Sequence, residues 1–595
     1  MDISKQEPAS NEVNGRPTQH AMLVAWGLFA QEIGLVEGIS QVKLHQKTKT
    51  HRPQKKVLEF LVAMLAGLPH LQDISRSAHP LDQDQVVAEA WGQTDWADYS
   101  GVSRTLQQLS ADEVGQISAE LNRISQPFID REIEQALHKN GRIVYDGDLT
   151  GRPVSSTSQS YPDAAFGYMG DEIRLGYQAA VVSLESPTYH RLWLANQLHA
   201  GDTVSVTQAQ SLVYAAELRT GLRPRRRTEL VSQRLADAQK ATAYADECYR
   251  ESEEQLHVAE QRVKQTTYDL GHWQREVYAL EAAYAVTGQQ PTNFCKLTRA
   301  RRKVTTYEQR LPRVEQALAR AEQRLQRHLR DLEQGQEEGV RLQAHLAQLT
   351  QDNMTNPQPI QALFRLDSGF ASRENIAWLI EMGYDIYTKA RTSKVQDSLS
   401  ALLTPETTWY KVGANASLTA WSNTTVNDAF IYPLNVALAR YQTGDSHKHA
   451  VLLHYGTEDV LLDLDAWFHR YNARQTIEAG IKEGKNVFQM HHLKVRSPHA
   501  LVLQEQFACF AANFIRFATH ALAHRQPSAS PILTASVKHL VQVCAHASAW
   551  VLRQGDVWLI TFAAQTLYAG LSLRFGSGPL QLPLPLFHDI HFSHF

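Results

Sequence analysis

The feature that most constrains the fold is a heptad pattern between residues 226 and 349. Apolar and small side chains recur there at alternating steps of three and four, first along residues 235–284 and again along residues 297–349. Such a repeat is typical of helices that pack against each other as a coiled coil. Residues 287–291 (TGQQP) separate the two arms and have the composition of a turn. The pattern therefore predicts an antiparallel coiled-coil hairpin with arms of about 80–90 Å each, at about 1.5 Å per residue.

The second arm is expected to begin at Thr292 or Asn293, since either residue suits a helix N-cap. Pro312 lies within this arm and should kink it, because proline lacks a backbone donor. Basic residues gather near the tip, at 299–303, and at the root, at 223–227. Three roles stay open for the hairpin: DNA contact, pairing with a second subunit, or an inert spacer with a solvated charged face.

Composition limits the class of protein. The 595 residues carry 59 Lys and Arg against 62 Asp and Glu, a formal charge of −3, and 43% of them are hydrophobic. These values exclude wholesale disorder, a collagen-like repeat and a membrane-embedded chain. They also disfavour a histone-like protein that coats nucleic acid by bulk charge. Locally the balance differs, because residues 479–550 contain seven basic and only two acidic side chains.

Cysteine usage and the apolar runs bear on the compartment. The four cysteines lie far apart without a CxxC pair, which indicates a reducing environment. The longest apolar run, residues 57–68, contains Glu59 and is too short to span a bilayer. Residues 1–17 are polar, lack the apolar core of a signal peptide and are expected to form a disordered leader. We therefore expect a cytoplasmic protein without a membrane partner.

The segments outside the hairpin predict an α/β fold. Residues 18–140 alternate helical apolar stripes with polar breaks. Within residues 95–113, the sequence Ser100-Gly101-Val102-Ser103 is compatible with the turn of a helix-turn-helix, and an ordinary helical bundle is the alternative. Short runs typical of strands and helices follow from residue 142. Strands are expected at 142–148, 177–184, 190–198, 361–366 and 384–389, with helices at 203–220 and 373–382, short strands over 405–463, a long helical stretch from Leu464 and strand-like runs beyond Trp550.

Three acids stand where a metal site would need them. Asp148 is expected at the end of the first strand, Asp367 follows the strand at 361–366, and Glu478 lies on the helical stretch after Leu464. Carboxylates from two adjacent strands and a neighbouring helix can converge on divalent cations. Oxygen ligands suit Mg²⁺ or Mn²⁺, and two such ions support in-line phosphoryl displacement.

The helix that carries Glu478 supports the same chemistry. At 100° per residue, Tyr471, Arg474, Glu478 and Lys485 fall within an arc of about 60°, and Lys482 lies beside it. A carboxylate flanked by cations suits a DNA backbone held next to a metal site. The alternative is an exposed amphipathic helix with i, i+4 pairs between Glu478 and Lys482.

These four residues also carry a resemblance. Tyr471, Arg474, Glu478 and Lys485 match without a gap the Y-(2)-R-(3)-E-(6)-K signature of a large group of bacterial insertion-sequence DDE transposases. The surrounding segment, residues 470–485 (RYNARQTIEAGIKEGK), is similar in texture as well.

Three further segments resemble the same enzymes. Residues 146–150 (DGDLT) and 367–370 (DSGF) look like their first- and second-aspartate motifs, and residues 199–203 (HAGDT) look like a loop after their third strand. The resemblance covers residues 142–225 and 360–520, and its motifs occur in the family's order.

The resemblance implies an RNase H-like core that binds two Mg²⁺ ions, with Mn²⁺ as a substitute, through Asp148, Asp367 and Glu478. It implies that Tyr471, Arg474 and Lys485, with Lys482 beside them, contact the phosphates of double-stranded DNA. The reaction would be cut-and-paste transposition: cleavage at terminal inverted repeats, in some relatives through a hairpin intermediate, and attack of the 3′-hydroxyl on target DNA. A homodimer that pairs two ends is expected, located at the nucleoid when bound to DNA. The alternatives are a non-catalytic DNA-binding or scaffolding derivative and a metal-dependent nuclease without strand transfer.

Some assignments have alternatives. Asp146 shares a strand face with Asp148, and Asp148 is preferred because a threonine follows it after one residue, as in the relatives. The hairpin interrupts the core between the two aspartate motifs, whereas relatives more often carry a β-rich insertion before the glutamate; this chain has both. Trp409 and Trp421 in that insertion would stack on a flipped base, as in some relatives, or pack in a core.

Other chemistries lack support. His491-His492 has no HExxH or Cys/His spacing around it, so a zinc site is not indicated. No GxxxxGK[ST] loop or Gly-x-Ser-x-Gly elbow is present. The predicted organisation has eight segments: leader (1–17), helical, DNA-binding region (18–140), first core segment (141–225), hairpin (226–352), second core segment (353–391), β-rich insertion (392–463), third core segment (464–530) and C-terminal region (531–595).

Overall fold

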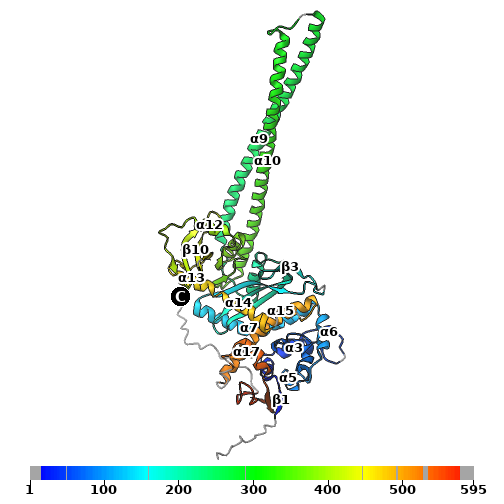
Figure 1. Cartoon of the computed structure of the whole chain (residues 1–595), viewed down its shortest axis with the longest axis vertical. Coiled ribbons are helices and arrows are strands. Elements are labelled where there is room, and N and C mark those ends of the chain that lie inside the picture. Colours follow the sequence, from blue (N-terminus) through cyan, green and yellow to red (C-terminus); the bar gives the residue numbers. More distant parts are fainter. Residues whose placement is uncertain are drawn as a thin grey trace, which may run out of the picture. The chain divides into compact units, whose positions relative to one another are not determined.

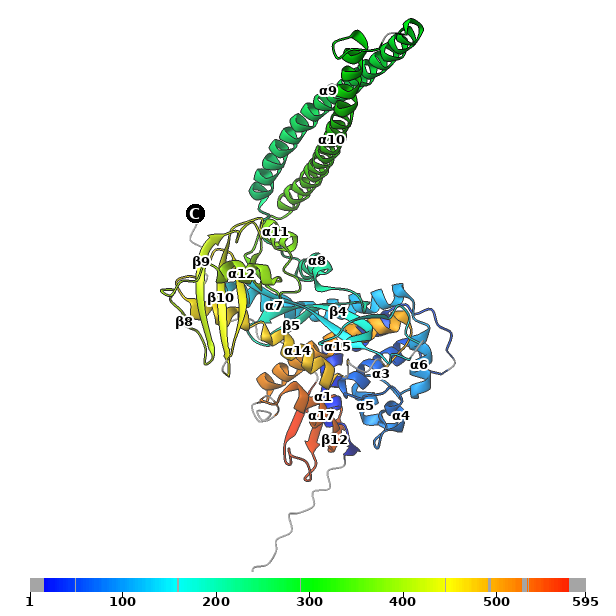
Figure 2. The same cartoon turned by 45° about the horizontal axis from the view of Figure 1, so that its top comes forward.

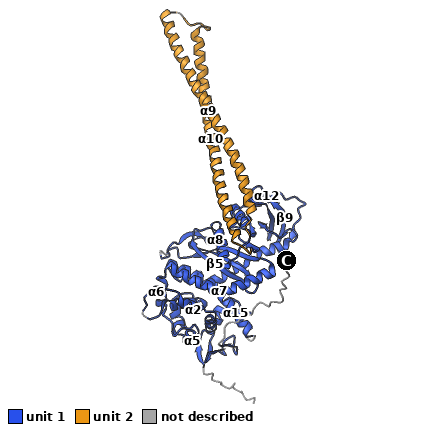
Figure 3. Ribbon diagram, turned by 180° about the vertical axis from the view of Figure 1, so that it is seen from behind, with its two compact units in different colours: residues 1–224, 359–595 blue, residues 225–358 orange. Residues whose placement is uncertain are grey.

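The computed structural model (Figure 1) describes residues 15–576, except 49, 158–159, 289, 445, 489, 491–493, 527–531 and 533. The chain divides into two compact units (Figure 3). One unit comprises Met1–Pro224 and Pro359–Phe595, and the other is Arg225–Gln358. Most of the predicted leader, residues 1–14, and His491-His492 lie outside the described residues. The predicted leader is too long, because Arg16 and Pro17 belong to strand β1 (Arg16–Thr18).

The smaller unit is the predicted helical hairpin. Helix α9 (Thr228–Thr287) and helix α10 (Lys296–Met354) pack along each other (Figure 1). The side chains buried between them lie on the heptad positions, with small or polar residues such as Ser252, Ala259 and Thr266 on α9 and mostly leucines on α10. The heptad pattern therefore predicted the hairpin correctly.

Details at the tip differ from the prediction. Helix α9 ends at Gly288, whose φ of 62° lies in the left-handed region that glycine tolerates. The N-cap of α10 is Cys295 and not Thr292 or Asn293, because the sulfur of Cys295 accepts a hydrogen bond from the backbone N–H of Thr298 at 3.4 Å. Helix α10 continues through Pro312 without a break.

The N-terminal part of the larger unit is helical. Helices α1, α3 and α7 bury continuous apolar faces, and α15 (Pro498–Arg525), from the C-terminal part of the chain, packs against α3 and α7. The turn predicted at Ser100–Ser103 is wrong: these residues lie inside α6, whose N-cap is Asp98, and the chain turns at residues 108–110 instead. The helices are α1 (Ala21–Glu32), α2 (Leu35–Gln41), α3 (Pro53–Leu65), α4 (Asp73–Arg76), α5 (Gln85–Ala90), α6 (Tyr99–Gln107) and α7 (Ala111–Asn140).

A mixed ten-stranded sheet forms the centre of the larger unit. Strand β4 pairs on one side with β5 and β3 and on the other with β2, and the order continues as β6, β7, β11, β10, β9 and β8. The pairs β2–β6 and β6–β7 are parallel and the others are antiparallel. The strands are β2 (Ile143–Pro153), β3 (Ala165–Tyr168), β4 (Ile173–Ser186), β5 (His190–Ala200), β6 (Ala362–Arg365), β7 (Asp385–Lys389), β8 (Tyr410–Lys411), β9 (Ala416–Thr424), β10 (Leu434–Thr443) and β11 (Ser446–Tyr455).

Helices cover both faces of this sheet (Figure 2). Helix α8 (Ala209–Thr220) packs on β2, β4 and β5, while α7, α14 (Gln475–Val487) and α15 contact the same strands from the opposite face. Helix α11 (Arg373–Glu381) connects β6 to β7 and packs on β7, and α12 (Ser393–Ser400) packs on β10 and β11. Because β2 and β4 are covered on both faces, they are buried along most of their length.

A second sheet joins distant parts of the larger unit. Strand β1 pairs with β12 (Ala549–Gln554), which continues to β13 (Val557–Phe562) and β14 (Ser572–Phe575). The strand-like runs predicted near Trp550 are therefore present, and helix α17 (Val537–Gln542) precedes them. Taken singly, no helix in the described ranges has the length and hydropathy needed to cross a membrane; α1 and α2 reach both only as a pair bent by 67°.

Candidate active site

Strand β2 places its two aspartates on one face of the sheet. Asp146 and Asp148 both point toward the face that carries α14, while Gly147 between them lies against Leu212 of α8 on the other. A Cβ atom at Gly147 would come within 2.7 Å of the side chain of Leu366, so glycine lets β2 and the segment after β6 pack closely. Asp148 was expected at the end of the strand, but β2 continues to Pro153 and Asp148 lies in its interior.

Asp146 belongs to a buried ion pair. The guanidinium of Arg365 donates two hydrogen bonds to its carboxylate, at 2.6 and 2.8 Å, and both side chains are at most 4% exposed. Burial raises the pKa of Asp146, and Arg365 opposes that shift. Arg365 also contacts Glu185 at 2.6 Å. Two-point pairing of this kind fixes β2 to β6 and leaves Asp146 little capacity for a ligand.

Asp148 shares its cation with Glu478. One terminal nitrogen of Arg474 lies 3.3 Å from the carboxylate of Asp148, and the other donates to Glu478 at 2.7 Å. Asp148 and Arg474 are nearly buried, whereas the side chain of Glu478 is 45% exposed. The guanidinium therefore joins two acids that lie on opposite sides of the hairpin in the sequence.

Asp367 completes this acidic cluster, which we define as Asp148, Asp367 and Glu478. It directly follows β6, and its carboxylate accepts a hydrogen bond from the backbone N–H of Gly369 at 2.9 Å. Lys389, the last residue of the adjacent parallel strand β7, lies close enough to both Asp367 and Glu478 for their charges to stabilise its ammonium. The structure therefore brings the three acids predicted from the sequence into one neighbourhood.

The three acids of the cluster are buried to different degrees and lie close enough to repel one another. Burial raises the pKa of Asp148 to about 6, and the charges of Asp367 and Glu478 add to the shift while Arg474 opposes it. Burial also raises the pKa of Asp367, with the same opposition from Arg474. The pKa of Lys389 is lowered by burial and by the nearby charge of Arg474. An added cation would favour the ionised carboxylates.

The helical stretch that carries the signature has a short interruption. Ala473 and Arg474 separate helix α13 (Leu464–Asn472) from α14, but both keep a right-handed helical backbone, and the N–H of Ala473 donates to the carbonyl of His469 at 2.8 Å. Tyr471 is only 4% exposed and packs in the core under β9 and β10, with the Nζ of Lys389 5.1 Å from the centre of its ring. Burial raises the pKa of Tyr471 to about 12.

The two predicted DNA-binding lysines differ in their setting. Lys482 is exposed on α14. Lys485 is half-buried, and its pKa is lowered by burial and by the neighbouring Arg152, an effect that Asp148 opposes. Arg474 contacts Glu478 at 2.7 Å and also neighbours Tyr471. The common 60° arc predicted for these residues and Lys485 stays a prediction.

The donor set fits a hard divalent cation in its chemistry. Carboxylate oxygens are the ligands that Mg²⁺ and Mn²⁺ prefer, and this cluster offers three carboxylates. Their placement is a separate matter. Within the described ranges, no three His, Cys, Asp or Glu side chains are grouped closely enough to hold a metal ion. Arg474 bridges two of the three acids instead.

The two tryptophans of the β-rich segment are half-buried. The guanidinium of Arg440 lies 4.2 Å from the ring centre of Trp409, whose other neighbour is His449. Trp421 lies on β9, opposite Val436 of β10. Stacking on a base stays a prediction for both residues.

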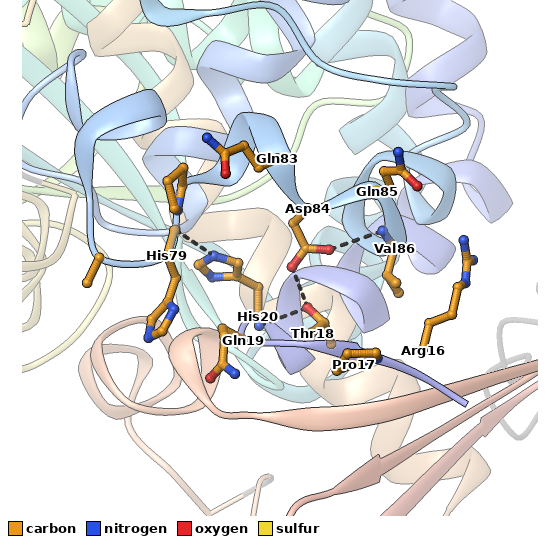
Figure 4. A pocket seen from close by; sticks show the side chains of 12 residues that line it. Arg16, Pro17, Thr18, Gln19, His20, His79, Gln83, Asp84, Gln85 and Val86 are labelled. Atoms are coloured by element: carbon orange, nitrogen blue, oxygen red, sulfur yellow. Dashed lines mark hydrogen bonds between the residues drawn. The ribbon is translucent and has the colours of Figure 1, made fainter. Parts of the chain in front are cut away.

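A cavity of about 420 Å³ lies apart from these acids, between β1 and residues 78–86 (Figure 4). Its polar groups serve the fold: Asp84 accepts hydrogen bonds from the hydroxyl of Thr18 at 2.6 Å and from the first turn of α5. His20 faces the backbone carbonyl of His79, and burial lowers its pKa. The cavity contains no member of the acidic cluster and offers no alternative set of reactive groups.

Sequence reasoning missed Lys389 and Arg365. Lys389 is the last residue of β7, which is parallel to β6, the strand that leads to Asp367. Because the ends of neighbouring parallel strands lie at the same edge of a sheet, the sequence could have predicted that Lys389 lies near Asp367. Arg365 precedes Asp367 by two residues and therefore points to the same side of the strand, where an acid on β2 needs a partner.

In comparisons with known proteins, no protein-family model matches this chain, and no curated protein matches it.

Proposed function

We propose that this protein is a DNA transposase of the DDE type, which cleaves the ends of a mobile element and joins them to target DNA with Asp148, Asp367 and Glu478 as its catalytic acids. The observation that carries the proposal is the convergence of these acids on Arg474 and Lys389, from three segments separated by the hairpin and the β-rich segment. The same acids belong to the motifs that resemble this family.

The strand order also supports the proposal. The segment β5-β4-β2-β6-β7 has three antiparallel strands followed by two parallel ones. This is the arrangement expected of the RNase H-like core that the resemblance implies. Asp148 and Asp367 then come from adjacent parallel strands, and Glu478 comes from a helix packed on the same face.

The chain's own residues have separable roles in this proposal. The three carboxylates would hold Mg²⁺, which supplies a Lewis acid for the scissile phosphate and lowers the pKa of an attacking hydroxyl. Arg474 and Lys389 place positive charge beside the carboxylates, where it suits a DNA phosphate. Arg474 would exchange part of its contact with Asp148 and Glu478 for that phosphate. Tyr471 supports Lys389 from the core side through its ring.

The test is cleavage of DNA that carries the element's own ends. Inverted repeats that bracket the reading frame, with short direct repeats outside them, would provide the substrate. We expect Mg²⁺-dependent cleavage at these ends by the full chain, with 3′-hydroxyl products and strand transfer to a second DNA. Asp148→Ala, Asp367→Ala and Glu478→Ala should each abolish cleavage while DNA binding is kept.

The outcomes separate the alternatives. Retained cleavage in any one variant would remove that residue from the catalytic set. Cleavage without any joined product would indicate a nuclease. Binding of the repeats by the wild-type chain without cleavage, at any concentration of Mg²⁺ or Mn²⁺, would indicate a non-catalytic DNA-binding protein.

A further inference from the structure

The tip of the hairpin contains a basic cavity. A hollow of about 630 Å³ lies between the end of α9 and the start of α10. Trp273 from α9 lines it with a half-buried indole, and Glu276 contributes one acid. Four exposed cations from α10 line the rest: Lys296, Arg299, Arg302 and Lys303. We refer to these four residues as the tip cations.

The tip cations lack acidic partners. Among the described residues, Arg301 makes an ion pair in this segment, with Glu281 at 2.6 Å, and no ion pair involves a tip cation. Residues 296–303 contain five basic and no acidic side chains. Their positive charge is therefore left to an outside partner, in a chain whose net charge is −3.

The middle of α10 has a different charge pattern. Residues 313–333 of α10 contain five basic and four acidic side chains, so that their charges nearly cancel. Nearer the root, Arg226 pairs with Asp352 at 2.9 Å and Arg234 with Glu338 at 2.8 Å. A solvated face on a coiled coil typically has such a balance of charges. The tip has an excess of positive charge instead.

We propose that the tip cations bind the phosphate backbone of double-stranded DNA, as a second DNA-binding site independent of the acidic cluster. Lys296, Arg299 and Lys303 stand at positions i, i+3 and i+7 and so share one face of α10. They extend over about 10 Å of helix, which suits several phosphates of one duplex and exceeds a single small anion. Binding through phosphates alone releases counterions and does not depend on base sequence.

This site goes beyond the proposed function, because it requires neither the acids nor a metal ion. It gives the hairpin a role in holding DNA that carries no terminal repeat. Trp273 in the hollow and the 79% exposed Phe294 beside it add aromatic surface to the same end of the hairpin. Charge complementarity selects a nucleic acid as the occupant. A second copy of the chain would bring the same positive charge to the contact.

The test measures binding of a duplex without terminal repeats to the full chain. Fluorescence anisotropy would be recorded in EDTA at several salt concentrations. Arg299→Gln with Lys303→Gln should weaken binding at least tenfold and reduce the slope of log K against log salt by about two. The matched control, Arg320→Gln with Arg324→Gln, removes the same charge from two exposed stalk residues and should change affinity less than twofold. Equal losses in both double variants would overturn the proposal.

Cys295 reports on the tip directly. Hydrogen bonds from Thr298 lower the pKa of its thiol to about 7, whereas burial raises the pKa of Cys509 to about 12 and also that of Cys544. We expect saturating duplex to slow alkylation of Cys295 by iodoacetamide at pH 7 at least fivefold, as resolved by mass spectrometry. Unchanged alkylation would overturn the proposal. The proposal would also be overturned if the tip variant, measured by light scattering without DNA, differed in mass from the wild type. Such a difference would show that the tip contacts a second copy of the chain.

Discussion

Two neighbouring regions of β2 bury aspartates in opposite ways. At Asp146, one guanidinium holds the buried carboxylate through two short hydrogen bonds and also contacts Glu185, whose side chain is 41% exposed. At Asp148, one guanidinium is divided between two carboxylates, with a third one nearby. The two aspartates are two residues apart and both are buried. Burial alone therefore does not distinguish a structural acid from a reactive one.

The difference lies in charge compensation. A buried carboxylate that its arginine holds through two hydrogen bonds contributes to the fold, and its loss strands the partner charge. Buried acids that repel one another cost stability, and proteins retain such clusters where a ligand binds them. This contrast leads us to assign Asp146 to the fold and Asp148 to the chemistry. Four predictions test it.

The largest expected effect separates the two aspartates by activity. Asp148→Asn should reduce Mg²⁺-dependent DNA cleavage at least about a thousandfold, because a cation bound there stabilises the transition state by several kcal/mol and each 1.36 kcal/mol is a factor of ten. Its melting temperature should stay the same or rise, since the substitution removes a poorly compensated charge.

Asp146→Asn is the matched control for that experiment. It should lower the melting temperature while the folded fraction still cleaves DNA at a rate within about tenfold of wild type. The assignment would be reversed if Asp146→Asn abolished cleavage by folded protein while Asp148→Asn left cleavage intact.

The second prediction concerns Arg365. Arg365→Gln should lower the free energy of unfolding by about 3–5 kcal/mol, because it leaves Asp146 buried without its cation. The double variant Asp146→Asn with Arg365→Gln should recover part of that loss, since no charge is then stranded. Urea unfolding followed by tryptophan fluorescence measures both. If the double variant is less stable than Arg365→Gln alone, the pair does not act through charge compensation.

The regular parts of this fold could be predicted because periodicity is a local signal. The heptad repeat identified α9 and α10 over more than a hundred residues, and short apolar runs located β2, β4, β5, β6 and β7. The proximity of the three acids was also predicted, although Asp148 lies in the interior of β2 and not at the strand end where it was expected. These inferences required no knowledge of how side chains pair across the chain.

The pairing itself could not be predicted. Asp146 and Arg365 are 219 residues apart, and only the parallel register of β2 and β6 brings them together. The interruption between α13 and α14 was not predicted, because Ala473 and Arg474 are good helix formers and keep a right-handed helical backbone there. The turn assigned to Ser100–Ser103 failed for a related reason, since Asp98 supplies an N-cap earlier in the chain.

The third prediction extends the comparison to Glu59, an acid whose burial outweighs the nearby charge of Lys55. Glu59 on α3 is fully buried, and burial raises its pKa to about 9, although its carboxyl accepts a hydrogen bond from the backbone N–H of Ala97 at 2.9 Å. Because the carboxyl group of Glu59 binds its proton more tightly in the folded state, its contribution to stability is fully present below pH 4.5. That contribution is lost as the pH rises toward 9. By pH 7 the loss is on the order of 3 kcal/mol. Glu59→Gln should remove that decline, as measured by unfolding between pH 5 and pH 8.

Glu113 is a contrasting case, because its exposed area is also small but its pKa shifts in the opposite direction. Burial pushes its pKa up, but hydrogen bonds from the backbone N–H groups of Ser110 and His45, at 2.8 and 2.6 Å, outweigh it and hold the pKa below the usual range. Its contribution to stability should therefore be present above pH 4.5 and be lost as the pH falls below that value. A parallel pH response in Glu59→Gln and Glu113→Gln would mean that burial alone governs both acids.

The smallest effect is expected at Glu185, the second carboxylate on Arg365. Its contact is as short as that of Asp146, at 2.6 Å, but its side chain is 41% exposed, so water screens the interaction and takes over its hydrogen bonds. Glu185→Gln should lower the free energy of unfolding by less than about 1 kcal/mol, several times less than Arg365→Gln. Urea unfolding in parallel with the Arg365 variant provides the comparison. An equal loss in the two variants would show that Arg365 needs both carboxylates, and that the Asp146 pair is, like the acidic cluster, a shared network of charges.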